Sequence, residues 1–228
     1  MTSNRSQTWT LAATGVAALG VSYYYYCYWW KNRQERRVII EVPKWLKQYE
    51  ASLANQTFQT DEELMQVAVD ISQRNVESGD GGPFGCAIFC RHKKTGLSKL
   101  YSVGANRVVP LNNSTLHGET VAIQFAQKKR QSFSLSATEE VEFVLCTSCE
   151  PCAMCLGATF WSGVSEMICS ATKDDAEAIG FDEGPVFPES YQKLEQIGMK
   201  VKKMVLREQG KKVLDDYAKT GIIYNGAA

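Results

Sequence analysis

The pattern of apolar and polar positions predicts an amphipathic helix that begins near Thr60. Thr60 and Glu63 have the spacing of a capping box, in which the two side chains satisfy free backbone N–H groups at the start of a helix. Apolar residues follow at i, i+3, i+4 and i+7, which places them on one helix face. These residues are Leu64, Val67, Ala68 and Ile71. The glycines and the proline within 79–83 end the helix.

Beyond this helix, short apolar runs alternate with helical patterns. Strands are predicted at residues 85–90, 100–108, 141–147, 167–171 and 200–206. Helices are predicted at 116–129, 152–162, 174–179 and 209–219. Residues 93–96 between the first two strands are typical of a hairpin turn. A hairpin followed by alternating strands and helices predicts an α/β fold with a mixed sheet covered on both faces.

The first 37 residues differ in character from the rest. Residues 9–30 contain no charged side chain, and a helix needs about 20 apolar residues to cross a bilayer. The segment ends in tyrosines and tryptophans followed by lysine and arginine, an order typical of a membrane interface with a cytoplasmic flank. We therefore expect 1–37 to be an extension that can anchor the chain through 9–30, with the enzyme facing the cytoplasm. A cleaved targeting peptide and a disordered aromatic tail are the alternatives.

Length and composition suit one domain plus this extension. The chain has 228 residues, 44% hydrophobic and 22% charged, as is ordinary for a globular protein. We assign 38–59 to a linker and 60–228 to the domain. The formal net charge is zero, whereas proteins that hold a nucleic-acid backbone usually carry a basic excess or a basic stripe. This balance favours a small-molecule substrate over a nucleic acid.

The cysteines indicate a metal site. The chain has eight cysteines, and three of them fall within seven residues: Cys149, Cys152 and Cys155. A disulfide framework spreads its cysteines along the chain, and a domain of this length does not need one. We expect a metal site in a reducing compartment.

Two short motifs bring together the residue types of a catalytic zinc site. They are His117-Gly118-Glu119 and Pro151-Cys152-Ala153-Met154-Cys155. Together they form H-x-E…P-C-x-x-C, the signature of zinc deaminases.

The chemistry of these residue types agrees with the signature. Cys152 and Cys155, at i and i+3 in a first helical turn, project to the same side, and a helix N-terminus favours thiolates. With His117 they give three protein ligands and leave the fourth tetrahedral position for water. Glu119 can pass protons to and from that water without binding the metal. A closed zinc site and a plain pair of buried cysteines are the alternatives. Cys149 is expected in the preceding loop, away from the metal.

The sequence around these motifs resembles the cytidine deaminase-like superfamily, and its guanine deaminase branch most closely. The resemblance is carried by residues 147–158 with Trp161, by 80–85 and by 174–182, and it covers roughly 60–185. It implies a three-layer α/β/α sandwich around a mixed five-stranded sheet, a bound Zn²⁺ and a homodimer.

The resemblance also implies a pocket for a base beside the zinc ion. Asn106 matches the asparagine that hydrogen-bonds the base, and Phe84 and Trp161 match aromatic residues that line the pocket. Packing in the core is the alternative for each aromatic residue, since a buried ring needs no ligand to explain it.

Two features of the chain depart from the guanine deaminase pattern. Guanine deaminases hold guanine with a carboxylate after Gly-Phe. This chain has Asp182 and Glu183 there, with Glu183 where an aspartate is expected. The end of the chain also differs, and because the C-terminal tail often completes the pocket in this family, Tyr224 is a further candidate.

These features predict zinc-dependent hydrolytic deamination of a guanine-type purine base or nucleoside, with release of ammonia. Cytosine, cytidine or a purine nucleoside is possible on the same core. A tRNA adenosine deaminase would need a basic rim, and the two basic clusters, 128–130 and 200–203, are typical of solvated helix or strand ends. A non-catalytic zinc protein would have no use for Glu119.

Overall fold

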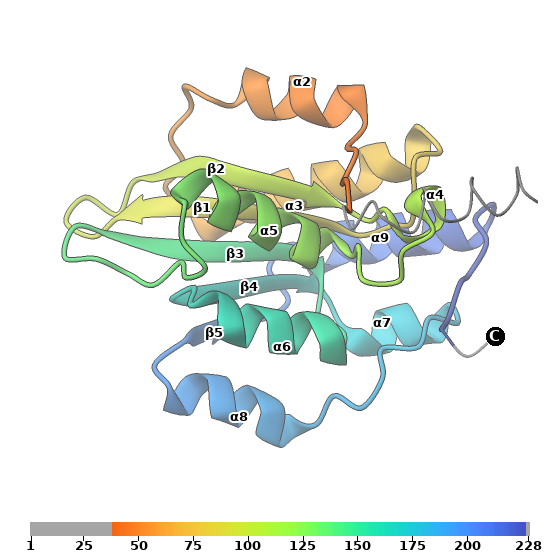
Figure 1. The fold of residues 1–228 in the computed structure, drawn as a ribbon. Coiled ribbons are helices and arrows are strands. Elements are labelled where there is room, and N and C mark those ends of the chain that lie inside the picture. The colour runs from red at the N-terminus through yellow and green to blue at the C-terminus, as the bar shows by residue number, and fades with distance from the viewer. Residues whose placement is uncertain (1–37, 227–228) are drawn as a thin grey trace, which may run out of the picture. The chain divides into compact units, whose positions relative to one another are not determined.

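The computed structural model describes residues 38–226. The chain divides into two compact units between Ile39 and Ile40, and the description below concerns the larger one, with the labels of Figure 1. Its strands are β1 (Gly85–His92), β2 (Ser98–Ala105), β3 (Val141–Cys149), β4 (Glu166–Ala171) and β5 (Lys200–Lys202). Its helices are α2 (Lys44–Ser52), α3 (Asp61–Glu77), α4 (Val108–Leu111), α5 (Gly118–Arg130), α6 (Ala153–Ser162), α7 (Lys173–Ala178), α8 (Pro188–Gln196) and α9 (Arg207–Ala218).

The strands form the predicted mixed sheet of five. Their order is β2-β1-β3-β4-β5. The pair β1–β2 and the pair β1–β3 are antiparallel, whereas β3–β4 and β4–β5 are parallel. The last strand is shorter than the predicted 200–206, because Met204 and Leu206 adopt left-handed backbone angles (φ of 63° and 55°) that interrupt the strand, although the Val205 N–H still donates to the carbonyl oxygen of Cys169 in β4 at 3.0 Å.

Helices cover both faces of the sheet, which confirms the three-layer arrangement. In Figure 1, α5 and α6 lie in front of the sheet, with α3 and α9 behind it. Successive residues of β1 point to opposite faces: Ala87 and Phe89 pack with the α3 side, while Cys86 and Ile88 pack with the α5 and α6 side. Both faces of the central strands are therefore buried.

The predicted capping box is present at the start of α3. The Thr60 hydroxyl accepts from the Glu63 backbone N–H at 3.2 Å, and the Glu63 carboxylate accepts from the Thr60 N–H at 3.2 Å. A capping box fixes where the helix begins. The helix then presents its buried residues, including Leu64, Ala68 and Ile71, to the sheet.

The segment assigned to a linker, 38–59, contains α2, a helix that was not predicted from the sequence. Leu46 of this helix is fully buried and belongs to the same core cluster as Phe89 of β1. Residues 40–59 thus lie in the same compact unit as the rest of the domain. Within residues 38–226, no helix is both long and apolar enough to span a membrane. The predicted anchor, 9–30, lies outside the described residues.

A buried ion-pair network crosses from α3 to the sheet. Glu166 of β4, with 1% of its side chain exposed, pairs with Arg91 and, at 2.7 Å, with Lys202. Arg91 also pairs with Asp61 at 3.6 Å and with Glu142 at 3.5 Å. Removing one partner of such a network leaves buried charge without compensation.

Replacing Glu166 by alanine is therefore expected to lower the free energy of unfolding by about 3 kcal/mol. This value is near the low end for buried pairs, because water can reach the Lys202 side chain. Urea denaturation measures the change. The control is Lys212→Ala, which removes an exposed pair with Asp216 and should leave the midpoint nearly unchanged. Equal midpoints for the two variants would contradict the expectation.

Candidate active site

Two helix N-termini meet at the site and bring the predicted residues together. His117 is the N-cap residue of α5, and Glu119 lies in the first turn of that helix. Cys152 is the N-cap residue of α6, and Cys155 lies in its first turn. The start of α5 approaches the sheet closely at Gly104, where a Cβ atom would lie 2.1 Å from the carbonyl oxygen of Gly118. Any larger residue at 104 would push the helix start away from the sheet.

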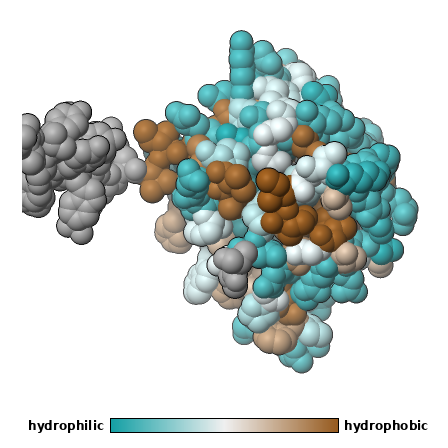
Figure 2. Space-filling model, turned by 90° about the vertical axis from the view of Figure 1, so that its right-hand side faces the viewer, coloured by the Kyte–Doolittle hydropathy of each residue, from teal (hydrophilic) through white to brown (hydrophobic). Residues whose placement is uncertain are grey.

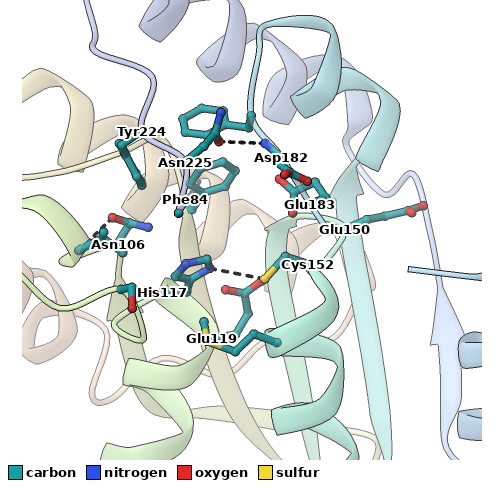
Figure 3. A pocket seen from close by; sticks show the side chains of 15 residues that line it. Phe84, Asn106, His117, Glu119, Glu150, Cys152, Asp182, Glu183, Tyr224 and Asn225 are labelled. Carbon is teal, nitrogen blue, oxygen red and sulfur yellow. Dashed lines mark hydrogen bonds between the residues drawn. The ribbon is translucent and has the colours of Figure 1, made fainter. Parts of the chain in front are cut away.

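The three predicted metal ligands form one cluster. A ring nitrogen of His117 and the sulfur atoms of Cys152 and Cys155 all lie within 4.8 Å of one another. His117 Nδ1 and Cys152 Sγ are 3.5 Å apart (Figure 3). In a tetrahedral zinc site, the usual bond lengths place neighbouring nitrogen and sulfur donors about 3.5–3.8 Å apart. The cluster therefore fits a zinc ion held by three protein ligands.

The three donors of the cluster bind protons with different affinities. The hydrogen bond with Cys155, and then that with His117, lowers the pKa of Cys152 to about 4. The same pairing with Cys152, followed by burial, raises the pKa of Cys155. Burial opposes a charge on His117, but its hydrogen bond with Cys152 and the nearby negative groups together raise its pKa. A metal that takes all three donors displaces the remaining protons, since only thiolates and neutral imidazole bind it.

Glu119 lies beside this cluster as a fixed and buried carboxyl group. Only 6% of the residue is exposed, and the Thr147 hydroxyl donates to its Oε1 at 3.1 Å. Burial, followed by the negative charge of Cys152, raises the pKa of Glu119. A buried carboxyl group that is fixed beside the metal donors can take up a proton and give it back during a reaction. The sequence motif predicted Glu119. Nothing in the sequence indicated Thr147 of β3 as its hydrogen-bond partner, although Thr147 lies in the run 147–158 that carries the family resemblance.

A cavity of about 370 Å³ opens beside the cluster. Its walls come from the loop before β1, the end of β2, the two helix starts and the C-terminal tail, as Figure 3 shows. The predicted pocket residues among its lining are Phe84, Asn106, Asp182, Glu183 and Tyr224. Volumes of this order are typical of small-molecule sites.

Two polar atoms in the cavity wall lack partners among the described residues. Asn106 Oδ1 accepts from the Val108 N–H at 3.2 Å, which leaves its Nδ2 buried without an acceptor. The Tyr224 hydroxyl is also buried without a partner, close enough to Gly82 that a Cβ atom there would lie 2.0 Å from it. Buried polar groups are normally hydrogen-bonded, so both atoms are suited to contact a polar ligand.

The carboxylates of the cavity differ in their surroundings. Glu183 is 6% exposed, and burial, followed by the charges of Cys152 and Glu119, raises its pKa to about 8. Asp182 is exposed at the rim, where its backbone N–H donates to Asn225 Oδ1 at 2.9 Å. Asn225 also donates to the carbonyl oxygen of Gly180 at 3.0 Å. These two bonds hold the C-terminal tail against the mouth of the cavity.

The structure does not place Trp161 in the pocket. Its side chain is 79% exposed, and it is not among the residues that line the cavity. Adjacent helix residues differ by about 100° in direction, so when Phe160 packs toward the core, Trp161 points to solvent. The aromatic residue that was missed is Phe181, which contacts the rings of Phe84 and Tyr224 at centroid distances of 4.9 and 5.3 Å.

The fold and the donor set together define the class of protein: a zinc-dependent hydrolase acting on C–N bonds. The family described as the cytidine and deoxycytidylate deaminase zinc-binding region matches residues 58–171, which include every residue of the zinc cluster and Glu119. The chain belongs to this family.

The chain is also similar to one curated relative and to two solved structures. The chain is 35% identical to guanine deaminase of Bacillus subtilis over 128 residues, which are 56% of this chain and 75% of that protein. It is similar to the structure of guanine deaminase from Nitrosomonas europaea, with 36% identity, a TM-score of 0.72, and coverage of 82% of this chain and 98% of the other. The chain is also similar to a structure in complex with 2,6-diaminopurine, with 37% identity and a TM-score of 0.71. This match covers 83% of this chain and 97% of the other.

Proposed function

We propose that the protein deaminates guanine or a closely related purine base by hydrolysis. The observation that carries the proposal is the buried carboxyl group of Glu183, which lines the same cavity as the zinc cluster and Glu119. The amino-bearing edge of guanine carries an adjacent ring N–H, so it offers two donors to one carboxylate. The corresponding edge of cytosine has an acceptor nitrogen beside its amino group. Similarity to two guanine deaminases supports the same choice.

The residues of the cavity suit each part of this reaction. A bound zinc ion would supply the activation of a water molecule at neutral pH. We assign to Glu119 the transfer of a proton from that water to a ring nitrogen and then to the departing amino group. Water adds to the amino-bearing carbon, the C–N bond breaks, and the products are xanthine and ammonia. We assign to Asn106 Nδ2 a hydrogen bond to an acceptor on the base, and to Phe84 and Phe181 packing against its ring.

The charge of the cavity favours an uncharged base over a phosphorylated substrate. Its lining includes four carboxyl groups, those of Glu119, Glu150, Asp182 and Glu183, and no lysine or arginine among the residues that the structure describes there. A nucleotide or a tRNA would bring phosphates to this rim, where binding normally requires cationic side chains. We therefore favour a free base over a nucleotide or tRNA.

Ammonia release from a panel of substrates tests the proposal. The zinc-loaded full chain is assayed with guanine, guanosine, 2,6-diaminopurine, cytosine and cytidine. We expect the largest kcat/KM for guanine or 2,6-diaminopurine. A larger value for cytosine or cytidine, or no turnover of any purine, would overturn the choice of base.

Replacing Glu183 by glutamine is expected to raise KM for guanine by about 10- to 100-fold, because the two N–H donors of guanine favour the ionised form of the Glu183 carboxyl group, and a hydrogen bond to a charged group contributes about 1.5–3 kcal/mol. Zinc content should not change, since Glu183 is not part of the ligand cluster. Asp182→Asn at the exposed rim serves for comparison and should have a smaller effect. Steady-state kinetics on both variants decide, and an unchanged KM for Glu183→Gln would refute its role.

The proposal also covers the oligomeric state of the chain and its attachment to a membrane. We propose a homodimer, as in the family that the sequence resembles, and attachment of residues 60–228, the catalytic domain, to a membrane through 9–30. Sedimentation of the purified chain measures the first, and a monomer at micromolar concentration would refute it. Alkaline extraction of membranes measures the second, which full release of the chain would refute.

A further inference from the structure

One wall of the cavity is built from two backbone segments that touch directly. The Asn106 N–H donates to the carbonyl oxygen of Phe84 at 3.0 Å. A Cβ atom at Gly81 would lie 2.2 Å from the carbonyl oxygen of Asn106, so the two segments meet with no room for a side chain between them. Both residues that we assign to the base, Phe84 and Asn106, therefore depend on how the loop at 80–84 is held.

A buried arginine holds this loop from behind the cavity. Arg107 is 7% exposed and does not line the cavity. Its Nη1 donates to the carbonyl oxygen of Asp80 and lies 3.9 Å from Asp80 Oδ1. Its Nε donates to the carbonyl oxygen of Glu41 at 3.2 Å. One planar guanidinium group thus joins the loop to Glu41, which lies 66 residues before the arginine itself.

Helix α2 contacts the loop at the same residue, Asp80. The indole N–H of Trp45 donates to Asp80 Oδ2 at 2.8 Å, so Asp80 receives one bond from Trp45 and another from Arg107. Glu41 and Trp45 precede residue 58, where the match to the family begins. The Asn75 side chain completes the support from α3, with bonds to the carbonyl oxygens of Gly82 at 2.8 Å and Asn106 at 3.1 Å.

We propose that Trp45, Asp80 and Arg107 act as a positioning clamp, through which the segment preceding the family domain sets the place of Phe84 and Asn106. None of the three touches the zinc cluster, so they are positioning residues and not catalytic ones. The clamp fixes the wall that binds the base, and none of its three side chains is among the clustered metal donors. The expected change in KM rests on the proposed function. The expected effect of the clamp on the loop at 80–84 does not.

The kinetic test compares two substitutions on the same helix. Trp45→Phe removes the hydrogen bond to Asp80, and the control Tyr49→Phe removes a hydrogen bond of 2.7 Å from Tyr49 to Asp70, away from the cavity. Trp45→Phe should raise KM about 2- to 10-fold, as expected for one hydrogen bond, with kcat and zinc content unchanged. Tyr49→Phe should change neither KM nor kcat. The same KM in both variants would overturn the clamp.

Substitutions of Asp80 separate positioning from general destabilisation. Asp80→Ala should raise KM as Trp45→Phe does, whereas Asp80→Asn keeps an acceptor oxygen for the indole and should restore most of the affinity. Melting temperatures of all variants are measured alongside. If KM follows the melting temperature across the series, including Tyr49→Phe, the effect is one of stability and the clamp is refuted.

Hydrogen exchange tests the clamp without a substrate. Trp45→Phe should speed amide exchange in peptides covering 79–86 and 105–108, while Tyr49→Phe should leave these peptides unchanged. Faster exchange there in a protein that turns over no purine would support the clamp and refute the proposed function. Unchanged exchange in a protein that deaminates guanine would refute the clamp and support the proposed function.

Discussion

Replacing Glu119 by glutamine is expected to lower kcat by about 10²- to 10⁴-fold, the usual contribution of a positioned acid or base. Glutamine keeps the size of the side chain and can still accept from Thr147, whose hydroxyl lies 3.1 Å from Glu119 Oε1. It cannot take up a proton from water, so the proton transfers stop while the metal cluster remains. Ammonia release and zinc content are measured on the same preparation.

The control for this prediction is Glu62→Gln, an exposed carboxylate on α3 that should leave kcat unchanged. We expect the Glu119 variant to contain as much zinc as the wild-type chain, because Glu119 is not one of the three clustered donors. A kcat within threefold of the wild-type value would show that the proton passes through another group.

Replacing Cys155 by alanine is expected to remove the zinc ion and, with it, all measurable deamination. Only His117 and Cys152 would remain as ligands, and stable zinc sites of this kind need three protein donors. Metal analysis after dialysis should find far less than one zinc per chain. Thermal unfolding should also lose the stabilisation that added zinc gives the wild-type chain, because a ligand that binds only the folded state stabilises it.

The matched control is Cys149→Ser, which answers whether a third cysteine binds the metal. Cys149 is buried, but its thiol donates to the carbonyl oxygen of Thr172 at 3.4 Å, a bond that serine can also make. It is not one of the three clustered donors. This variant should keep about one zinc per chain. Loss of zinc from it, or full zinc in the Cys155 variant, would contradict the ligand assignment.

The zinc cluster was predictable because each half of it depends on local geometry. Cys152 and Cys155 are related by one helical turn, and His117 and Glu119 lie at the start of another. Short-range spacing of this kind survives folding unchanged. The sequence pattern also predicted the five strands and both faces of the sheet, since β1 and β3 are apolar on both sides.

The walls of the pocket were harder to predict because they depend on long-range packing. Trp161 follows the zinc motif closely in the sequence, yet α6 presents it to solvent. Phe181 lies in a loop, and only the fold brings its ring against Phe84 and Tyr224. Helix α2 has no side-chain N-cap, but Val42, Trp45, Leu46 and Tyr49 stand at i, i+3, i+4 and i+7, so its apolar spacing was a helix signal that the linker assignment overlooked. Its bond from Trp45 to Asp80 spans 35 residues.

Zinc titration of the metal-free chain, followed by ammonia release from guanine, tests the central claim most directly. If His117, Cys152 and Cys155 hold the ion at which guanine is deaminated, activity should rise in proportion to bound zinc and level off at about one zinc per chain. Turnover of guanine by the metal-free chain, or no turnover once one zinc is bound, would contradict it.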